Sequence, residues 1–147
     1  MTTVLVYTFR TFPYISDLKN LFSNVFVLGK LKLDLTILLD QIRETKPDLV
    51  VGIAKSEEGT SHFEEIAVNQ FNRTTKVVDG AQKHFALFVP KLRDTAFGVS
   101  MKPTTSFCNY SVYFLKHALE REDVLIPVSF VHCNKKDLEK LPNILRL

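Results

Sequence analysis

The chain has 147 residues, of which 46% are hydrophobic and 24% are charged, and its formal net charge is +3. This composition predicts one globular domain over residues 1–147, large enough to bury a core without disulfides. The basic residues are scattered, which argues against a nucleic-acid partner. No apolar run approaches the roughly 20 residues of a membrane span, and the N-terminus lacks an export signal. We therefore expect a reduced, cytoplasmic protein with no membrane partner.

The first half of the chain alternates apolar strands with helices. We expect strands at Thr3–Thr8, Val25–Leu28 and Asp48–Ala54, and helices from Ser16 or Asp17 through Phe22 and from Asp34 to Lys46. Asp34 has the side chain of a helix N-cap, and Pro47 ends this helix because the residue before a proline avoids helical geometry. The continuous apolar run that ends at Ala54 is typical of a strand covered on both faces.

The second half combines weaker strand patterns with one long helix. We expect strands at Glu65–Phe71, Val77–Val78, His84–Val89, Phe97–Ser100 and Ile126–His132, a helix from Asn109 to about Arg121, and a last helical turn at Asp137–Leu141. The segment Lys55–Ser61 is polar and is predicted to be a loop. Helices between apolar strands indicate an α/β fold, a three-layer α/β/α sandwich with a mixed, mostly parallel sheet.

Two residues have the positions of a nucleophile and its base. Cys108 lies in the segment Thr104–Tyr110, directly before the long helix, where the helix dipole favours a thiolate. His132 ends the strand predicted for Ile126–His132 and is held rigidly there. If the two side chains meet, they form the core of a cysteine hydrolase. Because a free cysteine is more often a small core residue, position alone leaves both interpretations open.

The remaining histidines and the second cysteine predict no further chemistry. His62, His84 and His117 are expected to be surface or strand histidines, because none has an acidic residue at metal-ligand spacing. The two cysteines make no metal motif, and Cys133 points to the strand face opposite its neighbour His132. We therefore expect no metal ion and no cofactor.

Five segments in order along the chain carry a shared pattern. They are Val4–Phe12, Pro47–Ala54, Glu64–Asn69, Val99–Ser100 with Thr105–Tyr110 and Tyr113, and Ser129–His132. Together they resemble the pyroglutamyl peptidases of the pyrrolidone-carboxyl-peptidase type, a family of cytosolic cysteine peptidases. Cys108-Asn109 is similar to the family's nucleophile turn, and Phe130-Val131-His132 to its Phe-Ile-His base segment.

The resemblance implies acyl transfer on a peptide or small amide substrate. Cys108 would attack the amide that follows an N-terminal pyroglutamyl residue, and His132 would transfer the proton. Glu64, which matches the first residue of the family's Glu-x-Val-Ala-Ile-Asn segment, would orient the imidazole. Glu65 is the alternative acid, since neighbouring residues on a strand point to opposite faces.

The resemblance also suggests groups around the substrate. The backbone N–H of Cys108 and the side chain of Arg73 are the candidate oxyanion donors, although Arg73 is one position out of register. Phe9 and Phe12 match the aromatic residues that wall the pyroglutamyl ring, and Phe107 adds a third apolar surface. Phe9 and Phe12 are equally compatible with a purely structural role at the end of the first strand.

The chain departs from the family pattern at several substrate-shaping positions. Thr8 and Pro13 stand where glycines are usual, and Ala54-Lys55-Ser56 replaces a Gly-Gly-Arg-like stretch. The segment from Pro90 to Gly98 has room only for a turn where the family has a helix. Three interpretations follow: a shortened pyroglutamyl peptidase, a related cysteine amidase with another small substrate, or an inactive relative used for binding or assembly. The missing helix exposes a sheet face, so we also expect a homodimer or homotetramer.

Overall fold

The structure is a computed structural model that describes residues 2–93 and 96–146. Its elements, in chain order, are β1 (Val4–Phe9), α1 (Ile15–Leu21), β2 (Val25–Leu28), α2 (Leu31–Thr45), β3 (Leu49–Lys55), β4 (His62–Glu64), β5 (Ile66–Val68), β6 (His84–Ala86), β7 (Gly98–Ser100), α3 (Phe107–Arg121), β8 (Val128–Cys133), the 3-10 helix η1 (Lys135–Lys140) and α4 (Leu141–Ile144).

Most of these strands form one mixed sheet, which confirms the predicted α/β fold class. Its strand order is β2-β1-β3-β8-β4-β7, and β5 pairs separately with β6. The four strands β2, β1, β3 and β8 run parallel, whereas β4 lies antiparallel to β8, and β7 is parallel to β4. The helical connections between the parallel strands are those that such pairings require.

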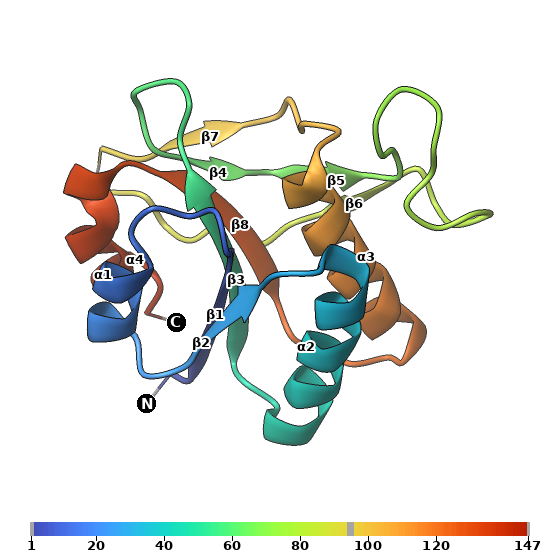
Figure 1. Cartoon of the computed structure of the whole chain (residues 1–147), viewed down its shortest axis with the longest axis horizontal. Helices are drawn as coiled ribbons and strands as arrows, with labels where there is room; N and C mark the ends of the chain where they lie inside the picture. The colour runs from blue at the N-terminus through green and yellow to red at the C-terminus, as the bar shows by residue number, and fades with distance from the viewer. Residues whose placement is uncertain (1, 94–95, 147) are drawn as a thin grey trace.

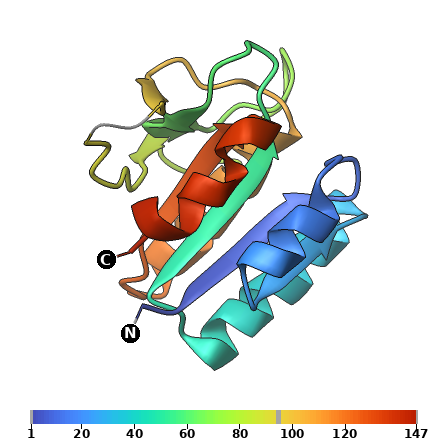
Figure 2. The same ribbon diagram turned by 90° about the vertical axis from the view of Figure 1, so that its left-hand side faces the viewer.

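Helices cover both faces of the sheet, so two apolar layers surround it. Figure 1 shows α2 and α3 on one side of the central strands, and α1 and α4 on the other. The first layer packs α2 and α3 on β1, β3 and β8, and includes Tyr7 and Phe130; the second packs α1, η1 and α4 on Val51 and Val131. Figure 2 shows α1 and α4 lying over the same sheet face. The strands therefore meet a packed layer on each side, as their continuous apolar runs predicted.

Helix boundaries differ slightly from the sequence prediction for local reasons. The helix predicted from Asp34 begins one turn earlier, at Leu31. The Asp34 carboxylate reaches back and accepts hydrogen bonds from the N–H groups of Gly29 and Lys30, at 2.6 and 2.8 Å. The side chain thus satisfies N-terminal donors from inside the helix rather than from its cap. At the other end, Lys46 adopts the left-handed conformation that closes the helix before Pro47.

The strand predicted for Glu65–Phe71 is wrong in its bounds, and the error matters for the site. The chain forms β4 up to Glu64 and then leaves the main sheet for β5, which starts at Ile66. Val77–Val78 is a bend rather than a strand, and the described residues of the segment from Pro90 to Gly98 contain no helix. Residues 94–95 lie outside the described residues. None of the described helices combines the length and apolar character that crossing a membrane requires.

A substitution at Gly52 in β3 tests how tightly the rings of Tyr7 and Phe130 pack against this strand. A Cβ at this position would lie 2.5 Å from both Phe130 Cδ2 and Tyr7 Cζ, and both rings are buried. We expect Gly52→Ala to lower the free energy of unfolding by about 1–3 kcal/mol through overpacking. Gly98→Ala is the matched control, because nothing lies within 4 Å of its Cβ, and we expect a change within about 0.5 kcal/mol. Urea unfolding measures both; equal stability of the two variants would contradict this packing.

Candidate active site

Cys108 lies in the first turn of α3 rather than before it. The helix begins at Phe107, and the N-cap residue Ser106 accepts a hydrogen bond from the backbone N–H of Cys108 at 3.3 Å. The hydroxyl groups of Thr104 and Ser106 are themselves hydrogen-bonded at 2.8 Å. Serine caps of this kind fix the entry of a chain into a helix. The cysteine is therefore held by the geometry of the helix start.

Side chains next to Cys108 anchor this turn to the strands. The amide of buried Asn109 donates to the carbonyls of Val68 and Gln70, at 2.8 and 3.1 Å, and its oxygen accepts from Val68 N–H at 2.9 Å. The Ser111 hydroxyl donates to the Cys108 carbonyl at 2.7 Å and lies 2.9 Å from the Tyr7 hydroxyl. These bonds tie the helix start to β5 and to β1, which limits movement of the thiol.

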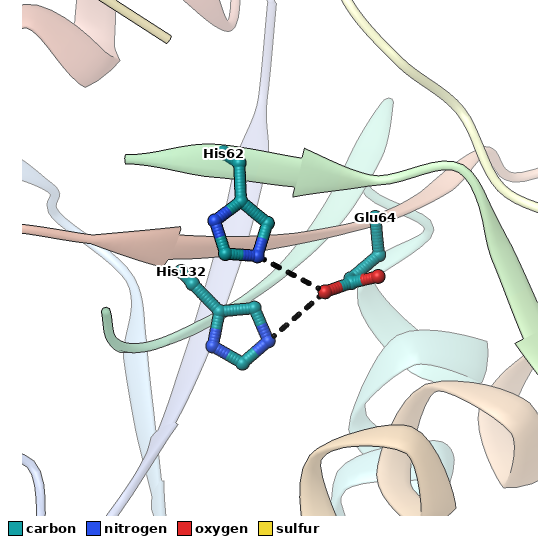
Figure 3. Close-up of side chains that lie close together, drawn as sticks. All are labelled: His62, Glu64 and His132. Atoms are coloured by element: carbon teal, nitrogen blue, oxygen red, sulfur yellow. Dashed lines mark hydrogen bonds and ion pairs between the residues drawn. The ribbon is translucent and has the colours of Figure 1, made fainter. Parts of the chain in front are cut away.

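Three ionisable side chains converge where β4 pairs with β8 in the sheet. His62 is the cross-strand partner of His132, and their rings stack with centroids 4.9 Å apart. Glu64, two residues along β4 and on the same face, has its Oε1 atom 3.2 Å from Nε2 of His62 and 3.2 Å from Nε2 of His132. Figure 3 shows both rings directed at this one carboxylate oxygen. Glu64, rather than Glu65, is thus the acid that reaches His132.

The electrostatics of this cluster favour a charged carboxylate. Burial alone would raise the pKa of Glu64, but the hydrogen bonds from His132 and His62 outweigh it, and the pKa lies below its ordinary value. The hydrogen bond with Glu64 raises the pKa of His62 against the opposing effect of burial. The second oxygen, Glu64 Oε2, is buried with no hydrogen-bond partner among the described residues. A buried acceptor without a donor is costly, so this atom is a place where a further ligand could bind.

Cys108 and His132 line the same cavities but make no direct hydrogen bond in the described structure. A small cavity is lined by Cys108, His132, Glu64 and Asn109, and a larger one by Cys108 and His132 together with loop residues. Burial raises the pKa of the Cys108 thiol to about 11; a hydrogen bond with Ser106 lowers it, and the charge of Glu64 raises it. The thiolate expected from the helix dipole is therefore not the resting state. A neutral thiol needs a base when it reacts.

The larger cavity has an apolar wall. Its volume is about 500 Å³, and Phe9, Phe12 and Phe107 line it beside Cys108. The Phe9 and Phe107 rings pack edge to face with centroids 4.9 Å apart. Phe9 and Phe12 are also buried in the two apolar layers, so they have a structural role as well. This cavity lies at the carboxyl ends of β1, β3 and β8, where α/β sheets bind their ligands.

The two groups expected to donate to an oxyanion, the Arg73 side chain and the Cys108 backbone N–H, do not point freely into the cavity beside Cys108. Arg73 is exposed, and it lines neither of the two cavities that contain Cys108 in the described part of the chain. The backbone N–H of Cys108 is already bonded to Ser106 Oγ, so it serves an oxyanion only if that 3.3 Å bond is exchanged. Cys133 belongs to the apolar layer on the opposite sheet face, as its strand position predicted.

His62 is the site residue that sequence reasoning missed. It was expected to be a histidine without an acidic partner, which is wrong, because it shares the Glu64 carboxylate with His132. The signal was the spacing His62-Phe63-Glu64, which puts two polar side chains on one strand face around a buried Phe63. It was hidden because the strand was expected to begin only at Glu65.

The protein is an α/β protein with a mixed sheet between two helical layers, and a cavity beside Cys108 lies at the carboxyl ends of its parallel strands. Comparison with solved structures shows that it has a pyroglutamyl peptidase-like fold. No family model matches the sequence, and no curated protein matches it either. The similarity of this chain to known proteins is found by comparing its structure with solved structures.

Three solved structures illustrate this likeness. Pyrrolidone carboxyl peptidase from Thermococcus litoralis is 22% identical with a TM-score of 0.77, and the match covers 90% of this chain and 76% of that chain. Pyroglutamyl peptidase I from Bacillus amyloliquefaciens is 17% identical, with a TM-score of 0.74 and coverage of 90% and 81%. A mutant pyrrolidone carboxyl peptidase from Pyrococcus furiosus is 20% identical, with a TM-score of 0.71 and coverage of 95% and 86%. At these identities the likeness is one of fold.

The raised pKa of Cys108 predicts how the thiol reacts with an alkylating reagent. In a Cys133→Ala background, we expect the rate of iodoacetamide alkylation to rise with pH through and beyond about pH 9, because the thiolate forms only near a pKa of about 11. The measurement is the shape of the rate–pH curve followed by mass spectrometry. The same chain unfolded in urea is the control, with a midpoint near the ordinary value of about 8.5. A folded-state midpoint below the unfolded one would contradict this account.

Proposed function

We propose that the protein is a cysteine exopeptidase that removes an N-terminal pyroglutamyl residue from peptides. The observation that carries this proposal is the 3.2 Å contact between His132 Nε2 and Glu64 Oε1, beside a cavity that His132 shares with Cys108. The pyroglutamyl peptidase-like fold supports the same chemistry. In this proposal Cys108 is the nucleophile, His132 the general base and Glu64 the orienting acid.

The contact between Glu64 and His132 suits the histidine to this role. With Nε2–H donating to the charged carboxylate, the neutral imidazole keeps its Nδ1 lone pair free. Nδ1 takes the proton from Cys108 as Sγ forms a bond to the substrate carbonyl carbon, and Glu64 stabilises the imidazolium that results. Because burial raises the pKa of the Cys108 thiol, the attack in this mechanism requires proton transfer to His132.

The reaction then proceeds through a thioester. The tetrahedral intermediate collapses, the amide C–N bond breaks, and the leaving amine receives the proton from His132. Water next gives a proton to His132 as its oxygen attacks the thioester carbonyl. The free acid leaves, and the proton returns to the Cys108 sulfur. The sulfur, the imidazole and the carboxylate are all restored, so no further reactant is required.

The cavity suits an uncharged ring at one end. The phenylalanines Phe9, Phe12 and Phe107 offer apolar faces to a pyrrolidone ring, and hydroxyl groups of Thr11, Thr104 and Ser106 line the same space. A volume of about 500 Å³ exceeds what one small ring needs and leaves room for the next residue. Lys55 and Glu57 also line this cavity, which favours, as a second candidate, a cysteine amidase for a small substrate with charged groups.

Hydrolysis of a fluorogenic pyroglutamyl amide tests the proposal. We expect the reduced protein to release the fluorophore, Cys108→Ala to lose turnover, and Glu64→Gln to lower kcat by ~10²–10⁴-fold, because the imidazolium loses its charged partner. The matched control is Cys133→Ala, which removes the other thiol from the opposite sheet face and should retain turnover.

The outcomes separate the candidate functions. Turnover that survives Cys108→Ala would remove Cys108 as the nucleophile. No turnover of the pyroglutamyl amide, with cysteine-dependent turnover of other small amides, would favour the amidase. No turnover of any amide would favour an inactive relative with a binding or assembly role.

Self-association remains a prediction from the sequence. The edge strand β7 carries an exposed Val99, followed by Met101, with exposed fractions of 48% and 69%. Apolar side chains on an edge strand favour pairing between copies. We expect light scattering at micromolar concentration to give the mass of two or four 16.8 kDa chains, and Val99→Lys to reduce it. The mass of one chain for the unmodified protein would contradict the prediction.

A further inference from the structure

We propose that His62, Glu64 and His132 form a binding site for a divalent transition-metal ion, of the class of Zn²⁺ and Co²⁺, and that the bound ion switches the peptidase off. The metal site itself stands on the geometry of these three residues. Its inhibitory effect rests on the proposed function, in which Glu64 and His132 act on Cys108.

The spacing of the donor atoms matches such a site. The Nε2 atoms of His62 and His132 each lie 3.2 Å from Glu64 Oε1, and one donor atom from each of the three residues lies within 4.8 Å of the other two. Ligands bound tetrahedrally at the usual Zn–N and Zn–O lengths of about 2.0–2.1 Å are separated by roughly 3.3–3.4 Å. The His–Glu separations therefore need little change to accept an ion.

The donor set has the right chemistry. Two neutral imidazoles and one carboxylate are the protein ligands of several catalytic zinc sites, which leave further positions to water or substrate. Glu64 is only 6% exposed, and its Oε2 atom is buried without a hydrogen-bond partner among the described residues. A cation held by both oxygens of this carboxylate would use Oε1, which faces the imidazoles, and would also engage Oε2, which the described protein groups leave unpaired.

The strands hold these ligands in place. His62 and His132 face each other across the β4–β8 pair, and Glu64 projects from the same face of β4 as His62. Sites built on strands hold their ligands more precisely than sites built on loops. An ion can also reach the cluster, since His132 lines the Cys108 cavity and His62 lines a separate open cavity of about 610 Å³ beside β7.

A bound ion would disable His132 as a base. Coordination uses the Nε2 lone pair, so the neutral imidazole then carries its proton on Nδ1. That nitrogen is the one that must accept the Cys108 proton in the proposed mechanism. The ion also occupies the Glu64 oxygen that would stabilise the imidazolium. His62 has no assigned task in the peptidase reaction and supplies the third ligand.

Binding of Co²⁺ to the full-length, reduced protein tests the site directly. We expect one ion per chain by equilibrium dialysis, with visible d–d absorption and no thiolate-to-cobalt charge-transfer band. His62→Ala and His62→Phe should each weaken binding at least tenfold; the second keeps an aromatic ring against His132, and thermal unfolding reports whether each variant is folded. His84→Ala, which removes an exposed histidine of β6, and Cys108→Ala should bind as the unmodified protein does.

Inhibition of turnover by Zn²⁺ tests the second half of the proposal. We expect Zn²⁺ to inhibit the unmodified protein and to inhibit His62→Phe at least tenfold less effectively, each measured against its own metal-free rate. Cobalt binding that persists in the folded His62 variants, or that is lost in Cys108→Ala with a charge-transfer band in the unmodified protein, would overturn the metal site. Binding without any peptidase activity would uphold the metal site and remove the proposed function, whereas peptidase activity without cobalt binding would do the reverse.

Discussion

His132 and Glu64 meet because β4 lies antiparallel beside β8, and the remainder of the site depends on this pairing. The register sets His62 opposite His132 and carries Glu64 to the same face two residues on. A shift of β4 by one residue would turn His62 and Glu64 to the opposite face of the sheet, away from His132. Phe63, between the two polar residues in the sequence, is fully buried in the apolar layer on the opposite face. The position of a short strand thus decides whether His132 has an acidic partner.

Cys108, the proposed nucleophile, is positioned by a different set of interactions. Asn109 binds the backbone of β5, and Ser111 joins the Cys108 carbonyl to Tyr7 in β1, so the first turn of α3 is held from two sides. The Cys108 side chain is also buried, and burial raises the pKa of its thiol to about 11. The buried position that holds Cys108 rigidly therefore also disfavours its thiolate form. The structure favours placement, and the proposed mechanism assigns deprotonation to His132.

Strong local patterns explain what could be predicted from the sequence. The parallel strands and α3 are long apolar or amphipathic segments, so their existence and the α/β class follow from periodicity. The pairing of β4 with β8 could not be predicted from periodicity, because β4 has only three residues. Its register is set by β8, which is distant in the sequence. The same reason hid His62, because the sequence alone does not show that His62 and Glu64 belong to one short strand. The raised pKa of Cys108 was missed because the helix dipole is visible in the sequence and the depth of burial is not.

The account depends on Cys108 carrying the acyl group under control of the Glu64–His132 pair, and trapping that intermediate is the most direct measurement. Acid quenching during turnover of a pyroglutamyl thioester, followed by intact-mass and peptide mass spectrometry, would reveal any adduct. The account predicts one pyroglutamyl group on Cys108, absent in Cys108→Ala and slower to form in Glu64→Gln. Turnover without an adduct on Cys108, or an adduct that forms equally fast in Glu64→Gln, would contradict it.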